Sequence, residues 1–486
     1  MAINCFIITN NIRQAKATVQ SLRAAEPAGD IFLLSDDAFA DNLEGCKTVK
    51  VDSLHSTATV RKIAEHSNTD YTLIYTKPTE LNLGMFALER MMQIAEDSDA
   101  GMVYADHYTI KDGVKTNTPV IDCQKGSLRD DFDFGSILLY KSAALKTAVA
   151  EITADYKHAG LYSLRLSVSR HAEPVHINEY LYTETENTLQ KSGEKQFDYV
   201  DPKNREVQIE MEAACTEHLK RIGAYLKPEF KSVDFSGETF SGEASVIIPV
   251  RNRVKTIGDA IRSVFMQKTN FKFNLIVIDN HSTDGTTAVI DSFSAADSRL
   301  VHIIPKSKEL GIGGCWNAGV HHHECGKFAV QLDSDDVYSG NDTLQKIVDA
   351  FYAQNCAMVV GSYMLTDFDM KIIPPGIIDH SEWTPENGHN NALRINGLGA
   401  PRAFYTPLLR KIKVPNTSYG EDYALGLAFS RHYRIGRIYD VLYLCRRWEG
   451  NSDAAIDIVK TNANNTYKDR IRTWEIEARR AMNEEN

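Results

Sequence analysis

Short runs of hydrophobic residues alternate with amphipathic stretches in the second half of the chain. Ser245–Val250 (SVIIPV), Leu275–Asp279 (LIVID), Val301–Ile304 and Phe328–Leu332 are apolar runs typical of buried strands, and a helical pattern lies near Thr256–Met266. Strands separated by helical stretches of about 10–15 residues are typical of a mostly parallel sheet. This half is therefore expected to be an α/β domain.

The first half opens with the same order of elements. Asn4–Thr9 and Ile31–Ser35 read as strands on either side of a helix over Arg13–Ala25, and Tyr71–Thr76 reads as a further strand. Both halves are thus expected to have the same type of fold.

A sequence repeat supports this interpretation. Tyr423–His432 (YALGLAFSRH) can be laid on Tyr162–His171 (YSLRLSVSRH), and without a gap Leu442-Tyr443 then falls on Leu181-Tyr182. A chance match is possible in so short a window, but the shared strand order makes duplication the better explanation. We expect two tandem α/β domains.

The composition of the segments predicts four parts of the chain. The predicted parts are a first domain over 1–190, a connector over 191–242 with a helix at Glu206–Tyr225, a second domain over 243–450, and a charged tail over 451–486 with a helix at Tyr467–Met482.

Composition narrows the class of protein. With 43% hydrophobic and 24% charged residues, a soluble globular protein is expected, and a net charge of −11 argues against a nucleic-acid groove as the main function. The 8 cysteines are scattered without a C-x-x-C pair, which fits a reducing cytoplasm. No stretch is predicted to be a signal peptide or a membrane span, although contact with a membrane surface is allowed.

An acidic run at the end of a predicted strand is the most specific chemical motif. Leu332 is followed by Asp333, Ser334, Asp335 and Asp336. Ligands of open α/β sheets bind at the carboxyl ends of strands, and oxygen ligands of this kind suit Mg²⁺ or Mn²⁺, which also bridge a diphosphate. A solvated acidic turn would explain the run equally well when it is considered alone.

Two further acidic elements follow the same logic. Asp279 ends a strand and precedes the turn Ser282–Thr286, so its carboxylate is placed to accept N–H groups of a base, whereas Ser282 and Asp284 are explained as helix caps. Gly420-Glu421-Asp422 opens a predicted helix, where a carboxylate could remove a proton from a hydroxyl or simply favour the helix dipole.

Three further motifs are weaker evidence for a site, and each has a structural explanation as well. The Gly-rich segment Gly311–Gly319 is interpreted as a loop used for packing rather than for phosphate binding. His321–His323 is a weak candidate for a metal site, because three consecutive residues on a helix point in different directions. Trp383 and His389 lie in the long segment Pro374–Gly399, which is as compatible with an acceptor site as with an ordinary surface loop.

Taken in order, these elements resemble the family 2 inverting glycosyltransferases with the GT-A fold. The resemblance rests on SVIIPVRNR, IVIDNHSTDGT, the Gly-rich N-A-G, QLDSDD and a later GED. It implies a Rossmann-like GT-A fold for the second half and a nucleotide-sugar donor, with a UDP-sugar favoured, and the repeat extends a GT-A-like fold to the first half. It also implies that Asp422 is the catalytic base, that Asp335 and Asp336 hold Mn²⁺ or Mg²⁺, and that the donor contacts are Pro249, Asp279, Asn317, Asp333 and Asp335.

The chain also departs from the family pattern. Trp316 stands before Asn317 where family members often have Arg, and Trp448 stands about where many have a late histidine that helps to hold the metal. Ligation by a late histidine is therefore in doubt. Arg446 and Arg447 are predicted to clamp the diphosphate, because guanidinium groups match phosphate oxygens.

The first half lacks the corresponding chemistry. The alignment puts Thr76-Lys77-Pro78-Thr79 at the acidic run, Leu161 at Asp422 and Thr183–Glu186 at the arginines. Other acids remain, namely Asp36-Asp37, Asp106, Asp131 and Asp133. We expect a non-catalytic domain for acceptor binding, docking or self-association, although a second activity at another site stays open.

The function expected from the sequence is transfer of a hexose or N-acetylhexosamine to a hydroxyl of a glycan or lipid-linked acceptor in cell-surface polysaccharide synthesis. The expected place is the cytoplasm or the inner face of its membrane, and a homo-oligomer is allowed. The alternatives are a sugar nucleotidyltransferase, a bifunctional enzyme with a second activity in the first half, and a non-catalytic glycan-binding protein. The sugar, the acceptor and the linkage do not follow from the sequence.

Overall fold

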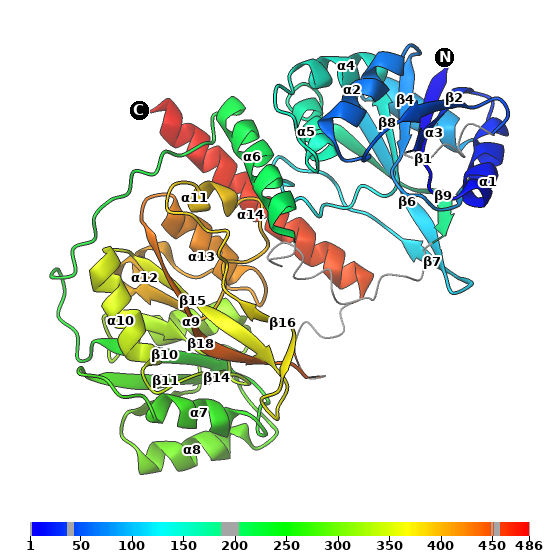
Figure 1. The fold of residues 1–486 in the computed structure, drawn as a ribbon. Helices are drawn as coiled ribbons and strands as arrows, with labels where there is room; N and C mark the ends of the chain where they lie inside the picture. The colour runs from blue at the N-terminus through cyan, green and yellow to red at the C-terminus, as the bar shows by residue number, and fades with distance from the viewer. Residues whose placement is uncertain (1, 36–42, 186–203, 449–450, 452–456, 486) are drawn as a thin grey trace. The chain divides into compact units, whose positions relative to one another are not determined.

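The computed structural model describes residues 2–35, 43–185, 204–448, 451 and 457–485. Two compact units divide them. Among the described residues, the second unit runs from Leu226 to residue 451, whereas the first combines the amino-terminal residues with Asn204–Tyr225 and with the residues from Asp457 to 485. Both are α/β structures with helices packed against a sheet (Figure 1).

The sheet of the second unit has the order β12-β11-β10-β13-β17-β15-β18-β14, with β16 beside β15. Its strands are β10 (Ala244–Val250), β11 (Phe273–Asp279), β12 (Leu300–Ile303), β13 (Phe328–Gln331), β14 (Val337–Tyr338), β15 (Met358–Thr366), β16 (Ile372–Ile378), β17 (Arg402–Tyr405) and β18 (Ile435–Arg446). β12, β11, β10 and β13 pair in parallel, and so do β15 and β18. The mostly parallel sheet predicted from the sequence is confirmed.

The sheet of the first unit repeats this order strand by strand, as β3-β2-β1-β4-β8-β6-β9-β5 with β7 beside β6. Its strands are β1 (Ile3–Ile8), β2 (Ala28–Ser35), β3 (Lys47–Lys50), β4 (Tyr71–Tyr75), β5 (Leu81–Leu83), β6 (Met102–Lys111), β7 (Val114–Thr118), β8 (Ile137–Lys141) and β9 (Pro174–Thr185). Every described strand has a counterpart in the other unit. The tandem duplication expected from the sequence is therefore confirmed.

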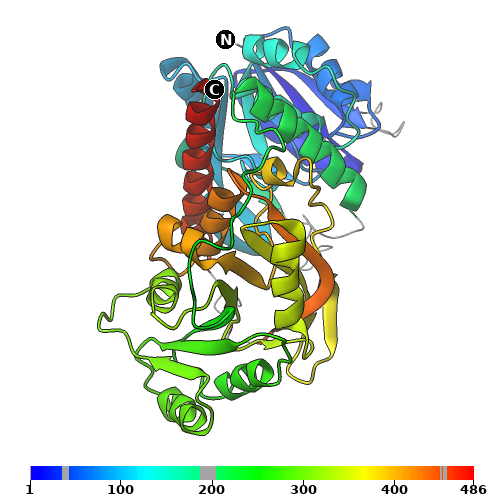
Figure 2. The same ribbon diagram turned by 90° about the vertical axis from the view of Figure 1, so that its left-hand side faces the viewer.

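Helices cover the sheets (Figures 1 and 2). Those of the first unit are α1 (Ile12–Arg23), α2 (Thr57–His66), α3 (Ala87–Asp97), α4 (Ser142–Ala150), α5 (Gly160–Val168), α6 (Arg205–Arg221) and α14 (Ile458–Glu484). Those of the second are α7 (Ile257–Phe265), α8 (Thr286–Ala296), α9 (Ile312–Val320), α10 (Thr343–Gln354), α11 (Gly388–Asn391), α12 (Thr406–Ile412) and α13 (Glu421–Ser430). α13 and α5 are the helices aligned by the repeat, and the Tyr423 and Tyr162 hydroxyls on them each donate to a backbone carbonyl.

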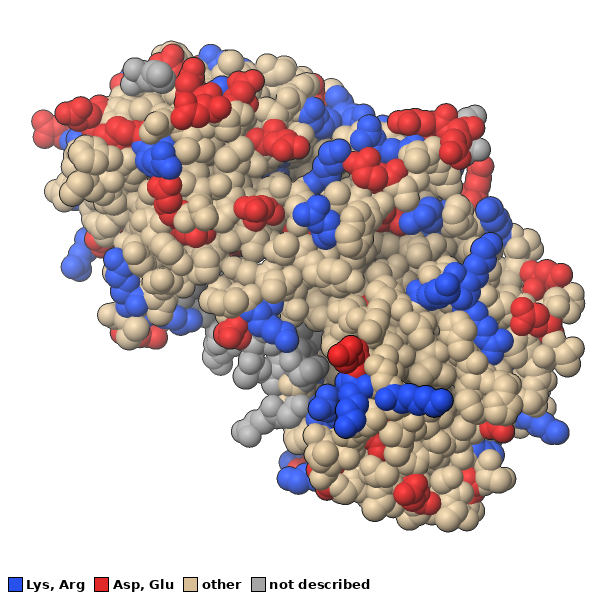
Figure 3. Space-filling model, turned by 180° about the vertical axis from the view of Figure 1, so that it is seen from behind, with Lys and Arg blue, Asp and Glu red and all other residues tan. Residues whose placement is uncertain are grey.

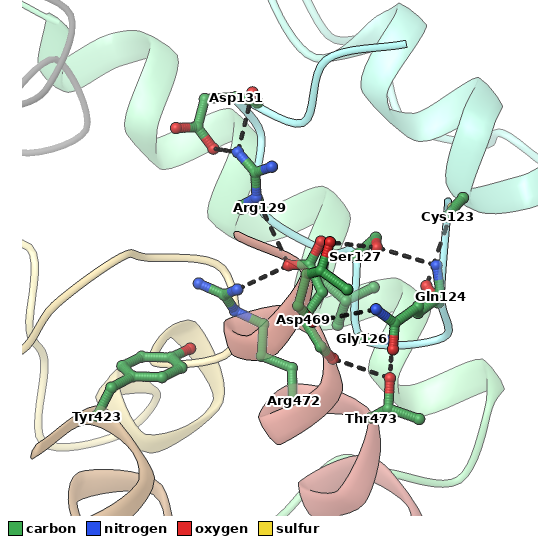
Figure 4. A network of polar contacts seen from close by, with 12 residues as sticks. Cys123, Gln124, Gly126, Ser127, Arg129, Asp131, Tyr423, Asp469, Arg472 and Thr473 are labelled. Carbon is green, nitrogen blue, oxygen red and sulfur yellow. Dashed lines mark hydrogen bonds and ion pairs between the residues drawn. The ribbon is translucent and has the colours of Figure 1, made fainter. Parts of the chain in front are cut away.

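The helix at the carboxyl end belongs to the first unit by its contacts. α14 is longer than the helix predicted at Tyr467–Met482. Its Asp469 is fully buried, where it accepts a hydrogen bond from Ser127 at 2.9 Å and pairs with Arg472 at 2.8 Å (Figure 4). The chain thus returns to its first unit after completing the second.

The Gly-rich segment is a helix, α9, and not the loop that we expected. A Cβ on Gly313 would lie 1.8 Å from the Pro415 carbonyl oxygen, and one on Gly314 would lie 2.2 Å from the Asn416 side chain. Glycine is a poor helix former, so the close packing against this neighbouring segment overrides its propensity. The packing role predicted for these glycines holds, whereas the loop does not.

Charged side chains are interspersed on the face drawn in Figure 3, where lysine and arginine gather in small groups beside aspartate and glutamate. Among the described helices, none has the length and apolarity that crossing a membrane requires.

Candidate active site

The acidic run lies directly after β13 in the second unit. Asp333 and Asp335 are partly exposed, whereas Asp336 is only 4% exposed. The run turns from β13 into β14, which pairs with the end of β18. The three carboxylates therefore differ in their surroundings although they are neighbours in sequence.

Asp333 is held from two sides. Its backbone N–H donates to the Tyr443 hydroxyl at 3.1 Å, and the Gln331 amide donates to both of its carboxylate oxygens, at 3.0 and 3.1 Å. Burial raises the pKa of Asp333, and Asp335 adds to this, while the Arg402 guanidinium opposes it. Burial thus outweighs the effect of the Arg402 charge on this carboxylate.

Asp336 faces the protein interior. Its Oδ1 accepts the backbone N–H of Arg446 at 2.7 Å, at the end of β18. Burial raises the pKa of Asp336 well above its usual value, and repulsion from Asp333 and Asp335 adds to the effect. This residue fixes the strand end at which Arg446 lies.

Asp335 is covered by the segment that follows β18. Its Oδ2 accepts from Trp448 Nε1 and from Asn451 Nδ2, both at 3.2 Å, and the Arg253 Nε lies 3.8 Å away. Trp448 therefore reaches the acidic run, where the resemblance suggested a histidine. Indole Nε1–H is only a donor, so Trp448 cannot be a metal ligand.

Arg446 is buried beneath the run. Its Nε donates to the Asp335 carbonyl at 2.6 Å, and its Nη1 pairs with Asp259 of α7 at 2.9 Å. Its Nη2 is buried without a partner. That unused donor is what a bound phosphate oxygen would satisfy. The neighbouring Arg447 is attached through its backbone, which donates to Thr366 at 2.8 Å.

Asp422 lies at the start of α13, after Gly420 with a φ of 77°. Its Oδ1 accepts the Tyr423 N–H at 2.7 Å, and its Oδ2 pairs with Arg402 Nη1 at 3.0 Å. Because Arg402 also lowers the pKa of Asp333, one guanidinium connects the acidic run to Asp422 electrostatically. The predicted base Asp422 and the predicted donor acid Asp333 thus act on the same guanidinium group.

Glu421 differs from its neighbour. Burial, together with repulsion from Asp422, raises the pKa of Glu421 to about 8, and its Oε2 has no hydrogen-bond partner. Glu421 is therefore predominantly protonated near neutral pH, which favours Asp422 as the proton acceptor.

Asp279 is fully buried at the end of β11. Its Oδ1 accepts the Ser282 N–H at 2.9 Å, and its Oδ2 accepts from the Thr287 hydroxyl at 2.5 Å. Pro249 pairs with Ile278 beside it. The carboxylate organises the turn into α8, and a contact with a nucleotide base stays a prediction.

Asn317 has a structural use. Its Nδ2 donates to the Val414 carbonyl at 2.7 Å and its Oδ1 accepts the Val414 N–H at 3.0 Å. This pair of bonds fixes the segment that leads to α13. A direct contact of Asn317 with donor remains a prediction.

The remaining candidates lie apart from the acids. His321 bonds the Asn317 carbonyl on its own helix. Trp383 and His389 line a separate cavity at the other end of α13. Over the described residues, no group of three or more His, Cys, Asp or Glu side chains is arranged to hold a metal ion.

The matching edge of the first unit carries a different set of charges. Lys77, in the stretch that follows β4, pairs with the buried Glu184 of β9, and His107 Nε2 lies 3.4 Å from the same carboxylate. Although burial raises it, the His107 hydrogen bond and the Lys77 charge lower the pKa of Glu184 to about 2. A protein cation thus lies where the second unit has its acidic run.

The other acids of the first unit are engaged elsewhere. Asp106 accepts from Val120 N and from His176, Asp131 pairs with Arg129, and Asp133 accepts the Gly135 N–H. Asp36 and Asp37 lie outside the described residues.

The sequence of the second unit is similar to that of known proteins. Residues 245–407 match the model of Glycosyl transferase family 2. The second unit carries a family 2 glycosyltransferase domain. The match includes Asp279, Asp333 and Asp335 and ends before Asp422.

Two curated relatives illustrate the similarity. The chain is 36% identical over 110 residues to the minor teichoic acid biosynthesis protein GgaA of Bacillus subtilis (strain 168), which is 22% of this chain and 24% of that protein. It is 33% identical over 93 residues to the GalNAc(5)-diNAcBac-PP-undecaprenol beta-1,3-glucosyltransferase of Campylobacter jejuni, which is 19% of this chain and 29% of that protein. The match thus spans less than a third of the length of either relative.

A crystal structure of S. aureus TarS 1-349 in complex with UDP-GlcNAc is also similar. The TM-score is 0.38 at 21% identity, over 49% of this chain and 72% of that one.

Sequence reasoning missed Arg402, Tyr443 as a site residue, and Asn451. Arg402 is an isolated arginine between a proline and an alanine, so nothing nearby in sequence pointed to it. In the sequence, Tyr443 stands out only as part of the repeat. Its role depends on β18 passing beside β14, which no local pattern predicts.

Proposed function

We propose that the second unit is an inverting glycosyltransferase, which moves a sugar from a nucleotide-sugar donor to a hydroxyl of a glycan or lipid-linked acceptor. A UDP-sugar is the favoured donor. The observation that carries the proposal is that the family 2 match includes Asp333 and Asp335, while Arg402, which pairs with Asp422 at 3.0 Å, also acts electrostatically on Asp333.

Asp422 acts as the base in this proposal. Its carboxylate accepts the proton of the acceptor hydroxyl, whose oxygen bonds to the anomeric carbon while the bond from that carbon to the diphosphate breaks. Attack comes from the face opposite the leaving group, so the anomeric configuration inverts. Arg402, at 3.0 Å, holds Asp422 in place.

The acidic run fits a divalent cation. Mg²⁺ is commonly held by one or two carboxylates together with substrate phosphates and water, so a cage of three protein ligands is not required. Asp335 is the proposed main ligand, with Asp333 or Asp336 beside it, and Asp336 would first have to release the Arg446 N–H. When bound, Mn²⁺ or Mg²⁺ would offset the negative charge of the leaving diphosphate.

Arg446 and Arg447 are proposed to bind the diphosphate as well. The free Nη2 of Arg446 supports this for the first of them. Asp279 is proposed to bind the base of the nucleotide and Asn317 to position the segment that leads to Asp422. Pro249 is proposed to shape the base pocket at the end of β10.

The proposed cellular role is synthesis of a cell-surface polysaccharide on the cytoplasmic side of a membrane. The names of the two relatives, which refer to teichoic acid biosynthesis and to an undecaprenol-linked acceptor, support this role. The first unit is proposed to be non-catalytic, because Lys77 and Glu184 stand at its matching edge.

A donor panel tests the function. The full chain is mixed with UDP-, GDP- and dTDP-sugars with and without Mn²⁺, and thermal stability and release of free nucleotide are measured. We expect one class of donor to stabilise the chain only with the cation and to release nucleotide when an acceptor is added. If no nucleotide sugar stabilises the chain, the proposal is wrong. If pyrophosphate is produced from a nucleoside triphosphate and a sugar phosphate, the protein is a nucleotidyltransferase.

A further inference from the structure

A cavity of about 160 Å³ lies in the second unit, away from the acidic run. Ser430, at the last turn of α13, lines it, while Glu421 and Asp422 are at the first turn. Nine residues of helix separate the two ends, which is roughly 14 Å. The cavity is thus a separate site connected to the proposed base by one rigid helix.

Aromatic rings form much of the lining of this cavity. They are the side chains of Phe230, Trp383, Tyr433 and Tyr439. Trp383 is 7% exposed and packs tightly, since a Cβ on Gly388 would lie 2.5 Å from its ring. The Tyr439 side chain is 51% exposed, and its hydroxyl donates to the Trp383 carbonyl at 3.3 Å. Flat apolar faces beside polar groups suit a hydroxylated ring better than a purely apolar ligand.

Two arginines supply the charge. Arg437 donates to the carbonyls of Leu398 at 2.8 Å and Asp379 at 3.1 Å, and its Nε is buried without a partner. Arg434 lies over the Phe230 ring at 5.8 Å. Neither guanidinium forms an ion pair with a carboxylate of a described residue, and no Asp or Glu lines the cavity.

The side chain of Gln354, a polar residue of the lining, already has hydrogen-bond partners. The Gln354 side chain accepts the Arg437 N–H and donates to the Arg437 carbonyl, both at 3.0 Å. Glu382 and Asp379 act on Arg437 electrostatically, but neither lines the cavity, and the buried Arg437 Nε has no acceptor. Two guanidinium groups with an unused N–H in a partly enclosed space favour an anionic ligand.

We propose that this cavity binds an anionic sugar residue, one that carries a carboxylate or a phosphate. The ring would pack against Trp383 and Tyr439, and the charged group would face Arg434 and Arg437. Binding of such a sugar is independent of catalysis. The further role, holding a part of the acceptor about 12 Å from Asp422 along α13, rests on the function proposed above.

Calorimetry on the full chain tests the binding. The probes are glucuronic acid, glucose 6-phosphate and glucose, so that carboxylate, phosphate and neutral sugar are compared. We expect at least one anionic probe to bind and glucose to bind at least about 10-fold more weakly, because hydrogen bonds to charged groups are the stronger ones. A response to glucuronic acid alone or to glucose 6-phosphate alone identifies the carboxylate or the phosphate as the recognised group.

Variants locate the site. Arg434→Gln and Tyr439→Ala change exposed side chains, so the fold should persist, and each should weaken the anionic probe, Arg434→Gln by about 10-fold. Lys411→Gln, an exposed charge on α12, is the matched control and should bind as the wild type does. Asp335→Ala should also bind normally, which separates this cavity from the donor site.

Two results would overturn the proposal: no binding of either anionic probe, or equal binding of glucose. An anionic probe whose affinity is unchanged by both cavity variants would overturn it as well. None of these results bears on nucleotide release with Mn²⁺, so failure of this proposal and failure of the glycosyltransferase proposal are distinguishable.

Discussion

Asp335 has the weakest attachments of the acidic run, because its side-chain donors lie at 3.2 Å and its nearest guanidinium at 3.8 Å. Asp333 and Asp336, by contrast, are tied to a strand or to a buried tyrosine. A cation can therefore replace the contacts of Asp335 at the smallest cost. This contrast separates the three acids, which the sequence alone presents as equivalent.

Asp335→Ala should weaken donor binding and lower turnover together, because the cation loses its main anchor. The measurement is the affinity for the nucleotide sugar with and without Mn²⁺. Asp349→Ala, which removes an exposed carboxylate from α10, is the control and should leave both quantities unchanged. A variant whose metal dependence equals that of the wild type would contradict the assignment.

Asp422→Asn should reduce turnover by about 10²–10⁴-fold, the usual value of general-base assistance. Donor affinity should barely change, because Asp422 is assigned to the acceptor side. If Asp422 only favours the start of α13, the change would be nearly silent, since Asn is also well suited to a helix start. Near-normal turnover would therefore exclude Asp422 as the base and would make Glu421 the next residue to test.

The raised pKa of Glu421 predicts that the stability of the folded protein depends on pH. Its pKa is raised from 4.5 to about 8 in the folded protein, so the folded state binds more protons than the unfolded state between those values. The free energy of unfolding should therefore fall as pH rises from about 5 to 8. Denaturant unfolding at several pH values, for wild type and Glu421→Gln, measures this. The variant should lose much of the slope, and an equal slope in both would show that other groups cause it.

At the scale of elements, α14 is the helix whose assignment to a unit could not be predicted from the sequence. It comes after the second unit in the chain, but its buried charges belong to the first. Asp469 pairs with Arg472 at 2.8 Å and lies 3.5 Å from Arg129, and all three side chains are almost fully buried (Figure 4). A Cβ on Gly126 would lie 2.2 Å from the Asp469 carbonyl oxygen, so the helix packs directly on the backbone.

Asp469→Ala should destabilise the first unit by about 3–5 kcal/mol, because it removes a fully buried carboxylate that faces the buried guanidinium groups of Arg472 and Arg129. Hydrogen exchange followed by peptide should show faster exchange in β1, β4 and α5, with little change in β10 and β13. Glu477→Ala on the same helix is the control. Its pair with Lys125 is exposed, so its effect should stay within about 0.5 kcal/mol. Equal loosening of both units would contradict the assignment of α14.

At the scale of the whole molecule, the two units share one strand order but have different polar residues at the matching strand ends. The second unit places acids at the end of β13, while the first places Lys77 near Glu184 after β4. Fold and chemistry have thus separated after duplication, since a sheet depends on many apolar positions and a site on a few polar ones.

The full chain carrying both Asp335→Ala and Asp422→Asn should release no nucleotide from any common nucleotide sugar above the uncatalysed rate. The full chain is the right material, because the first unit is built from three separate stretches. A residual metal-dependent release by this variant would show that the first unit has an activity of its own.

The sequence alone determined what depends on local pattern. Apolar runs separated by amphipathic stretches predicted the strands β1, β4, β10 and β13, because burial of both faces of a parallel sheet requires such runs. The repeat at Tyr162 and Tyr423 predicted the duplication. The acids Asp333, Asp335 and Asp422 could be picked out because carboxylates at strand ends and helix starts are chemically distinctive.

Tertiary structure decided what depends on residues far apart in the chain. Arg402 joins Asp422 to the acidic run, Trp448 and Asn451 reach Asp335, and α14 returns to the first unit. α9 forms despite its glycines, because the backbone near Pro415 packs against it. In each case the contact joins segments tens to hundreds of residues apart, and its free energy depends on packing and desolvation that a local pattern does not contain.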